Sequence, residues 1–182
     1  MNFKSCLQAW LTAVALIAIS SVAAQSDGQQ WYGGSEDVAF AEDLWNAMLQ
    51  AKLVGSEAQP GKPYIGLHPH GAILESEIHT IAVRGVSGIL AAKRSYRGVG
   101  TTVEDVEVNR SEFIVDITVM FKREAGYDSA AQNWFWAKYN PDGSLDVTPN
   151  GVQLAGRIAK GKPKGCIACH LRAPGGDLLF AN

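Results

Sequence analysis

Two cysteines and a histidine lie within five residues near the C-terminal end of the chain, as Cys166-Ile167-Ala168-Cys169-His170. Residues three apart share one face of a helical turn, so both thiols of this C-x-x-C-H motif can reach one flat group while the histidine points at its centre. The spacing is the attachment signal for c-type haem, with Cys166 and Cys169 bonded to the porphyrin and His170 as the axial ligand of the iron. The motif therefore requires a helical turn that faces a haem-sized cavity.

Three other uses of the two thiols compete with haem attachment. A thioredoxin-like redox pair needs the motif early in a βαβ unit, but here it lies close to the end of the sequence. A zinc site needs further ligands, which His68 and His70 in His-Pro-His could supply. A structural disulfide between Cys166 and Cys169 is the third alternative. The adjacent histidine favours haem attachment over all three.

The first residues have the layout of a secretory signal peptide. Lys4 is followed by an apolar stretch from Trp10 to Ile19, and small residues lead to a cleavage site after Ala24. We therefore expect residues 1–24 to be removed, residues 25–34 to form a flexible lead-in and residues 35–182 to form a single domain. Export to the periplasm or beyond agrees with the motif, because c-type haem is normally attached outside the cytoplasm.

The charge balance makes nucleic acid an unsuitable partner. The chain has 16 basic and 18 acidic residues, and loss of Lys4 with the signal peptide makes the mature domain more negative. Cys6 is also lost with that segment. Hydrophobic residues make up 47% of the sequence, so the domain needs no disulfide framework and its two remaining thiols are free for chemistry.

Periodicity predicts an α+β fold with a mainly antiparallel sheet, an N-terminal helix and a C-terminal haem-attachment helix or loop. A helix of roughly four turns begins near Ser35, with Ser35 or Asp37 as its N-cap. Its predicted apolar stripe consists of Val38, Ala41, Leu44, Trp45, Met48 and Leu49. The predicted strands are centred on residues 74–82, 89–92, 112–121 and 134–139, followed by a turn at 141–143 and a last helix over 152–159.

The methionines bear on the second axial position of the iron. Small electron-carrying cytochromes c usually donate an axial methionine from beyond the motif, but Met48 and Met120 both precede it. We therefore expect the sixth iron position to be open or weakly held, which favours binding or catalysis over electron relay. A plain electron carrier would need a strong sixth ligand such as Met120 or His79.

Most of the chain from about residue 65 resembles the cytochrome P-460 family, which includes the cytochromes c′-beta. The stretches that carry the likeness are 88–96, 117–128, 133–143 and 165–180, with weaker matches at 69–71 and 77–83. The resemblance implies an exported mono-haem protein of α+β fold, often a homodimer, with a histidine on one side of the iron and a free face on the other. The short link Arg84 to Ser87 departs from the family's longer, helix-containing connection and predicts a tight hairpin.

The resemblance also implies the chemistry. Members called cytochrome P-460 oxidise hydroxylamine, and the cytochromes c′-beta bind nitric oxide. This chain is therefore expected to be an oxidoreductase acting on hydroxylamine or a similar small nitrogen compound with a soluble redox partner such as another cytochrome. A non-catalytic nitric-oxide-binding protein and an electron carrier are the alternatives. In catalytic members a lysine is bonded to the porphyrin edge, and Lys93 matches that position in the pattern Lys-x-x-Tyr.

Further residues are candidates for supporting roles. Lys93 follows an apolar run, so burial would lower its pKa and supply the neutral amine that such a bond requires. Substrate oxidation also needs proton acceptors, for which the candidates are Glu75, Glu77, His79 and Asp116. Three lysines before the motif form a candidate docking patch for an acidic redox partner, with a solvated loop as the alternative: Lys160, Lys162 and Lys164.

Overall fold

The computed structural model describes residues 30–59, 61–67, 70–160 and 166–180. The predicted signal peptide, His68, Lys162 and Lys164 lie outside these residues. The helices are α1 (Ser35–Gln50), α2 (Val103–Val108), α3 (Arg110–Phe113) and α4 (Cys166–His170), with a 3₁₀ turn at Ser129–Ala131. The strands are β1 (Tyr64–Ile65), β2 (Ile73–Val83), β3 (Val86–Tyr96), β4 (Ile114–Lys122), β5 (Trp134–Tyr139) and β6 (Ala155–Gly156).

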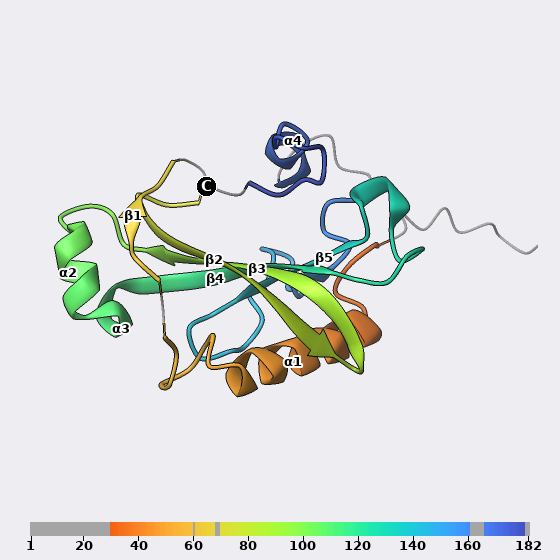
Figure 1. Ribbon diagram of the computed structural model, residues 1–182, viewed down its shortest axis with the longest axis horizontal. Coiled ribbons are helices and arrows are strands. Elements are labelled where there is room, and N and C mark those ends of the chain that lie inside the picture. The colour runs from red at the N-terminus through yellow and green to blue at the C-terminus, as the bar shows by residue number, and fades with distance from the viewer. Residues whose placement is uncertain (1–29, 60, 68–69, 161–165, 181–182) are drawn as a thin grey trace, which may run out of the picture.

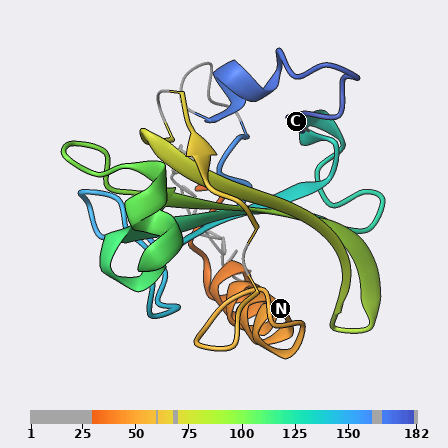
Figure 2. The same ribbon diagram turned by 60° about the vertical axis from the view of Figure 1, so that its left-hand side comes forward.

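The six strands form one antiparallel sheet in which neighbours in the sequence are neighbours in space. Figure 1 shows the sheet across the middle of the molecule, with α1 beneath one face and α4 above the other. The view of Figure 2 keeps the same three layers. The predicted α+β fold with a mainly antiparallel sheet is therefore confirmed. Within the described residues, no helix is both long and apolar enough to cross a membrane.

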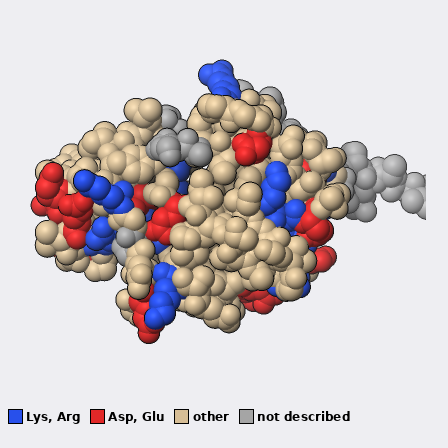
Figure 3. Space-filling view, in the orientation of Figure 1, with Lys and Arg blue, Asp and Glu red and all other residues tan. Residues whose placement is uncertain are grey.

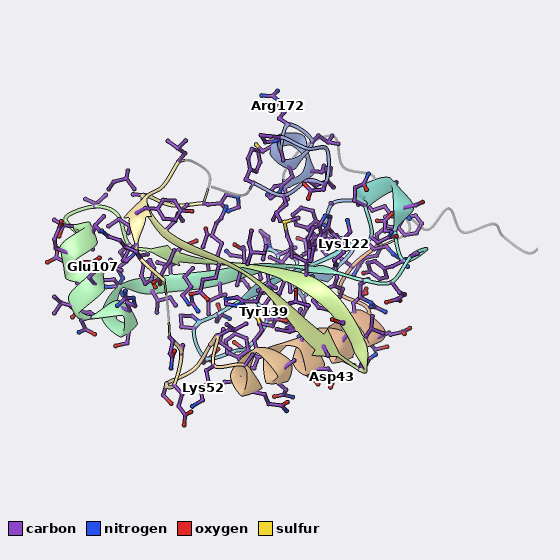
Figure 4. The ribbon with its side chains drawn as sticks, in the orientation of Figure 1. Asp43, Lys52, Glu107, Lys122, Tyr139 and Arg172 are labelled. Atoms are coloured by element: carbon purple, nitrogen blue, oxygen red, sulfur yellow. The ribbon has the colours of Figure 1, made fainter. Side chains whose placement is uncertain are left out.

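Helix α1 closes the larger of the two hydrophobic cores. Ala41, Leu44 and Met48 of its predicted stripe are buried, and Phe40 joins them between the sheet and the helix. Figure 4 shows Tyr139 of β5 in this layer, and its hydroxyl donates to the carbonyl of Ala41 over 2.8 Å. Burying a large side chain such as Phe40, Leu44 or Met48 contributes roughly 1.5–3 kcal/mol, so this layer stabilises the fold.

The predicted cap of α1 was wrong. Gly34 is the N-cap, with no side chain bonded to the helix end. The carboxylate of Asp37 instead lies against Gly156, where an added Cβ would approach it to 2.6 Å. The residues before α1 are hydrogen-bonded to the segment around β6. The backbone N–H of Arg157 donates to the carbonyl of Trp31, and that of Gly33 donates to the carbonyl of Ala155. The described end of the predicted lead-in is thus attached to the domain.

The segment predicted as a last helix is not helical. Residues 152–159 contain the short strand β6, which pairs with β5. Gly151 and Gly156 have φ of 78° and 118°, in the left-handed region that interrupts a helix. Residues 152–159 therefore form a short strand and turns in place of the predicted helix.

The connection between β3 and β4 contains two helices that periodicity did not reveal. Thr102 and Asp105 form a capping box at the start of α2, so its first turn is stabilised locally. The predicted strand at 112–121 accordingly starts two residues later, after α3. Figure 3 shows acidic side chains gathered at this end of the molecule, where α2 carries Glu104, Asp105 and Glu107.

Candidate functional site

The C-x-x-C-H motif forms one helical turn, α4, as its spacing predicted. Ile167 is buried in a second hydrophobic cluster that includes Trp134, Trp136 and Leu178, and this contact attaches the turn to the sheet. Cys166 and Cys169 are exposed and carry free thiols. Arg172, just after α4, points away from the sheet (Figure 4).

His170 is buried and held by its Nδ1 atom. Nδ1–H donates to the carbonyl of Leu178 over 2.6 Å. That carbonyl is positioned in turn because Trp134 Nε1 donates to the carbonyl of Asp177 over 2.6 Å. Since Nδ1 carries the proton, Nε2 keeps its lone pair and is available to a metal.

The charge state of His170 suits a ligand. Burial lowers its pKa, the hydrogen bond to Leu178 opposes that shift, and the charge of Lys93 adds to the lowering. The ring also meets Trp136 and Phe180 nearly edge-on, with centroids 4.9 and 5.5 Å away. A neutral imidazole fixed by aromatic neighbours can present Nε2 in a single direction.

A cavity of about 770 Å³ lies between α4 and the sheet. Strand register places two rows of side chains on its floor. The polar row is Ser76, Lys93, Thr118 and Lys138, and the apolar row is Ile78, Ala91, Met120 and Trp136. The roof includes His70, Cys166, His170, Leu179 and Phe180.

The floor exposes apolar surface that the protein itself does not cover. Ile78 is 48% exposed although it lines the cavity, and Trp136 is buried with an indole N–H that has no hydrogen-bond partner among the described residues. A buried donor without a partner costs about 1–3 kcal/mol. The cavity therefore suits a large, mainly apolar guest with polar groups at its rim.

Lys93 lies in the middle of the polar row. Burial lowers the pKa of its ammonium group. Across residues 30–59, 61–67, 70–160 and 166–180, it forms no ion pair with a carboxylate. The neutral amine is therefore more accessible than in an exposed lysine, and it can act as a nucleophile within the cavity.

The four candidate proton acceptors lie in different environments. Glu75 is fully buried beneath the sheet end, where it accepts from the hydroxyl of Tyr96 and from Arg110, the latter over 3.3 Å. It does not line the cavity. Asp116 is ion-paired to Lys138 over 3.2 Å. Both carboxylates serve structural ion pairs.

Glu77 borders the cavity, but strand register places its side chain in one row with Ala92, Val119 and Ala137, on the sheet face toward α1. Arg94 donates to its Oε1 over 2.8 Å, and the Nε2 atom of His79 lies 3.0 Å from its Oε2. Burial would raise the pKa of Glu77, but Arg94 outweighs burial and, with His79 and the backbone of Gly61, holds the pKa below its ordinary value. His79 itself does not line the cavity.

The alternatives for the motif lose their structural context. The thiols lie beside an antiparallel sheet, so the βαβ unit of a thioredoxin-like pair is missing around them. Within the part of the chain that the structure describes, no three His, Cys, Asp or Glu side chains are close enough to hold a metal ion. The two thiols are free, which leaves the disulfide without support.

His70 enters the cavity from the loop before β2. Its ring centroid lies 6.1 Å from that of His170, with the two planes at 88°. Burial lowers its pKa to about 4, with further lowering from the charges of Lys93 and His170 and an opposing contribution from Asp116. His70 is thus neutral at pH 7, and the sequence predicted only that it could bind metal with His68.

The remaining sequence predictions had mixed outcomes. Trp134 and Trp136 lie on the cavity side and Phe135 lies on the α1 side, because side chains alternate along a strand. Lys160 is not free to dock a partner, because its Nζ lies 3.3 Å from Asp128 and 4.4 Å from the ring centroid of Trp31. The sequence analysis missed Lys138, although its period-two spacing from Trp136 marks it as a cavity residue.

Comparison with protein-family models, with curated proteins and with solved structures found no match for this chain. The chemistry of the cavity is therefore the basis on which its function can be inferred.

Proposed function

We propose that this chain is an exported c-type mono-haem oxidoreductase that oxidises hydroxylamine or a similar small nitrogen compound. The observation that carries the proposal is the convergence of the thiol of Cys166, the free Nε2 of His170 and the amine of Lys93 on one cavity. Cys166 and Cys169 would bond to the porphyrin edge, and His170 would hold the iron.

The residues present fit a haem. The cavity volume of about 770 Å³ lies in the range of cofactor sites, about 300–1,000 Å³. Its apolar row suits the porphyrin ring, whereas Lys62, which lines the same cavity, suits a propionate group. The unpartnered N–H of Trp136 offers a further donor. When bound, the haem would supply an iron centre able to bind and oxidise a small nitrogen compound.

The protein's own residues would orient the substrate. Each hydroxylamine oxidised to the level of nitrous oxide gives up two electrons and two protons, so the reaction needs a soluble electron acceptor such as another cytochrome. The hydroxyls of Tyr64 and Ser76, 2.7 Å apart, line the cavity and can hydrogen-bond a small polar substrate.

The Lys93 cross-link is a part of the proposal that rests on the resemblance to cytochrome P-460. The bond would replace one N–H of Lys93 and one C–H of the porphyrin, so its formation releases two electrons and two protons to an oxidant of the peroxide class. The half-buried amine, which forms no ion pair among the described residues, supports this role, because a protonated amine cannot form the bond.

Covalent attachment is tested by removing both thiols. The variant Cys166→Ala/Cys169→Ala should lose all haem when extracted with acidic solvent, whereas the wild-type protein should keep it and show a haem-stained band after denaturing electrophoresis. The single variant Cys169→Ala is the matched control, and it should keep haem through Cys166. Retention of haem by the double variant would show that the thiols do not attach it.

The alternative function is nitric oxide binding without catalysis, which the resemblance to the cytochromes c′-beta favours. Proteolysis of the wild-type protein distinguishes the two. An oxidoreductase of the proposed type should yield one haem species that joins the Lys93 peptide to the Cys166–His170 peptide in mass spectrometry. Lys93→Ala should abolish that species and hydroxylamine oxidation but retain nitric oxide binding. If the wild-type digest carries haem on the cysteine peptide alone, the oxidoreductase proposal is wrong and nitric oxide binding is the function that stays supported.

A further inference from the structure

His70 is an imidazole that the proposed function leaves unused. It lines the same cavity as His170, and among the described residues its ring makes no hydrogen bond with another side chain. Its backbone leads directly into β2 through Gly71, whose φ of 115° turns the chain at this point. The ring is therefore positioned next to the long central strands while its nitrogens remain free.

The separation of the two imidazoles matches that of two ligands on one metal. An imidazole nitrogen binds a first-row metal at about 2 Å, and the ring centre lies about 1 Å behind that nitrogen. Two rings on opposite sides of one iron therefore have centroids roughly 6 Å apart. The observed distance between His70 and His170 is 6.1 Å. A distal histidine that only contacted an iron-bound ligand would have to lie farther away, because the ligand would occupy the space between.

The other candidates for the sixth position are less well placed. Met120 is buried in the cluster that contains Ile167 and Trp136, so it lies with the side chains that surround His170. His79 is bonded to Glu77 and does not line the cavity. Lys93 projects from the middle of the sheet floor. Among the residues considered for this position, His70 lies at the distance from His170 that shared ligation requires.

We propose that His70 is the sixth ligand of the iron in the resting protein and that small ligands must displace it. This inference rests on the proposed function, because it needs a haem held by His170. It replaces the expected open sixth position with one that is occupied by a protein side chain at rest. Ligand entry would then depend on the dissociation of His70.

The test compares the ferric spin state of wild type, His70→Ala, His70→Gln and His79→Ala. Wild type and His79→Ala, the matched histidine control, should be low-spin in absorption and electron paramagnetic resonance. Both His70 variants should be high-spin, and added imidazole should return His70→Ala to the low-spin state. Circular dichroism checks that each variant is folded, and the Gln variant keeps the side-chain size should Ala fail this check.

Cyanide binding gives an independent readout. In wild type the observed rate should reach a plateau as cyanide increases, because dissociation of His70 becomes limiting. In His70→Ala it should rise linearly and be about tenfold faster or more at low cyanide, since a histidine bound in nine-tenths of molecules leaves about one-tenth competent.

The outcomes separate this inference from the proposed function. A haem-stained band after denaturing electrophoresis together with a high-spin wild type, or with a low-spin His70→Ala that contains no added ligand, would overturn the role of His70 alone. The absence of such a band from wild type would contradict covalent haem attachment, and with it both proposals.

Discussion

At the scale of single residues, burial and charged neighbours set the protonation of each group around the cavity. Burial lowers the pKa of Lys93, and it is the largest cause of the lowered pKa of His70. Both groups therefore tend toward the neutral forms that bond to carbon or metal. Glu77 behaves differently, because Arg94 at 2.8 Å outweighs its burial and keeps it ionised. The cavity thus holds neutral bases, whereas the carboxylate of Glu77 on the opposite face of the sheet stays ionised.

Glu77 should make the folded state sensitive to acid. Its pKa is lowered on folding, so its stabilising contribution is present above the unfolded carboxylate pKa and is lost as pH falls through the lower folded value. Glu77→Gln should therefore reduce the free energy of unfolding at pH 7 and lose less of it between pH 5 and pH 3 than wild type does.

Urea denaturation at several pH values measures this effect. Glu57→Gln is the control, since Glu57 forms an exposed ion pair with Lys52 and should follow the wild-type curve. Parallel pH dependence in wild type and Glu77→Gln would show that Glu77 is not the group responsible.

At the scale of elements, the β2–β3 hairpin depends on a two-residue turn. Arg84 and Gly85 have φ of 51° and 78°, as a type I′ turn requires, and Val83 pairs directly with Val86. Arg84 also donates to Asp43 of α1 over 2.6 Å. The tight hairpin expected from the short connection is confirmed, and it connects the two longest strands, both of which contribute to the cavity floor.

Replacing Gly85 tests the turn. A Cβ at Gly85 would meet no atom within 4 Å, so Gly85→Ala changes the backbone energy and no packing contact. An L-residue in the left-handed region costs about 1–2 kcal/mol, and the free energy of unfolding should fall by that amount. Ser87→Ala, at a nearby exposed site, is the control and should stay within about 0.5 kcal/mol of wild type. An unchanged midpoint in Gly85→Ala would mean that the turn relaxes to another conformation.

At the scale of the whole molecule, the two faces of the sheet differ in how fully other segments cover them. The face toward α1 has a continuous apolar core, whereas the face toward α4 contains the cavity. In the described part of the chain, short segments cover the second face, and contacts such as that of Ile167 and the hydrogen bond from Trp134 to Asp177 hold them. A bound group in the cavity would supply the missing packing.

Removal of the haem should therefore lower thermal stability. The haem-free Cys166→Ala/Cys169→Ala variant should melt below the haem-bearing wild type, by about 2–4 °C for each kcal/mol of lost binding energy. Differential scanning calorimetry measures the shift, with haem-bearing Cys169→Ala expected near wild type. Equal melting temperatures for the haem-free and haem-bearing proteins would show that the cavity-filling group does not support the fold.

The sequence by itself determined the features that depend on neighbours along the chain. The five residues from Cys166 to His170 specify a helical turn and its chemistry, because residues three apart share a helix face. Strand alternation placed Trp134 and Trp136 on one face and Phe135 on the other. The buried positions Ala41, Leu44 and Met48 of α1 and the hairpin after Val83 were predicted for the same local reason, whereas Leu49 of the predicted stripe is exposed.

Only the tertiary structure decided which of these groups meet. Strand register brought Lys93 into one row with Ser76, Thr118 and Lys138, and chain folding brought His70 to 6.1 Å from His170. The same contacts withdrew Glu75 into an ion-pair network away from the cavity. Sequence periodicity records which way a side chain faces, but burial, charge neighbours and metal-ligand distances depend on residues far apart in the chain, so they arise only when the sheet and its covering segments come together.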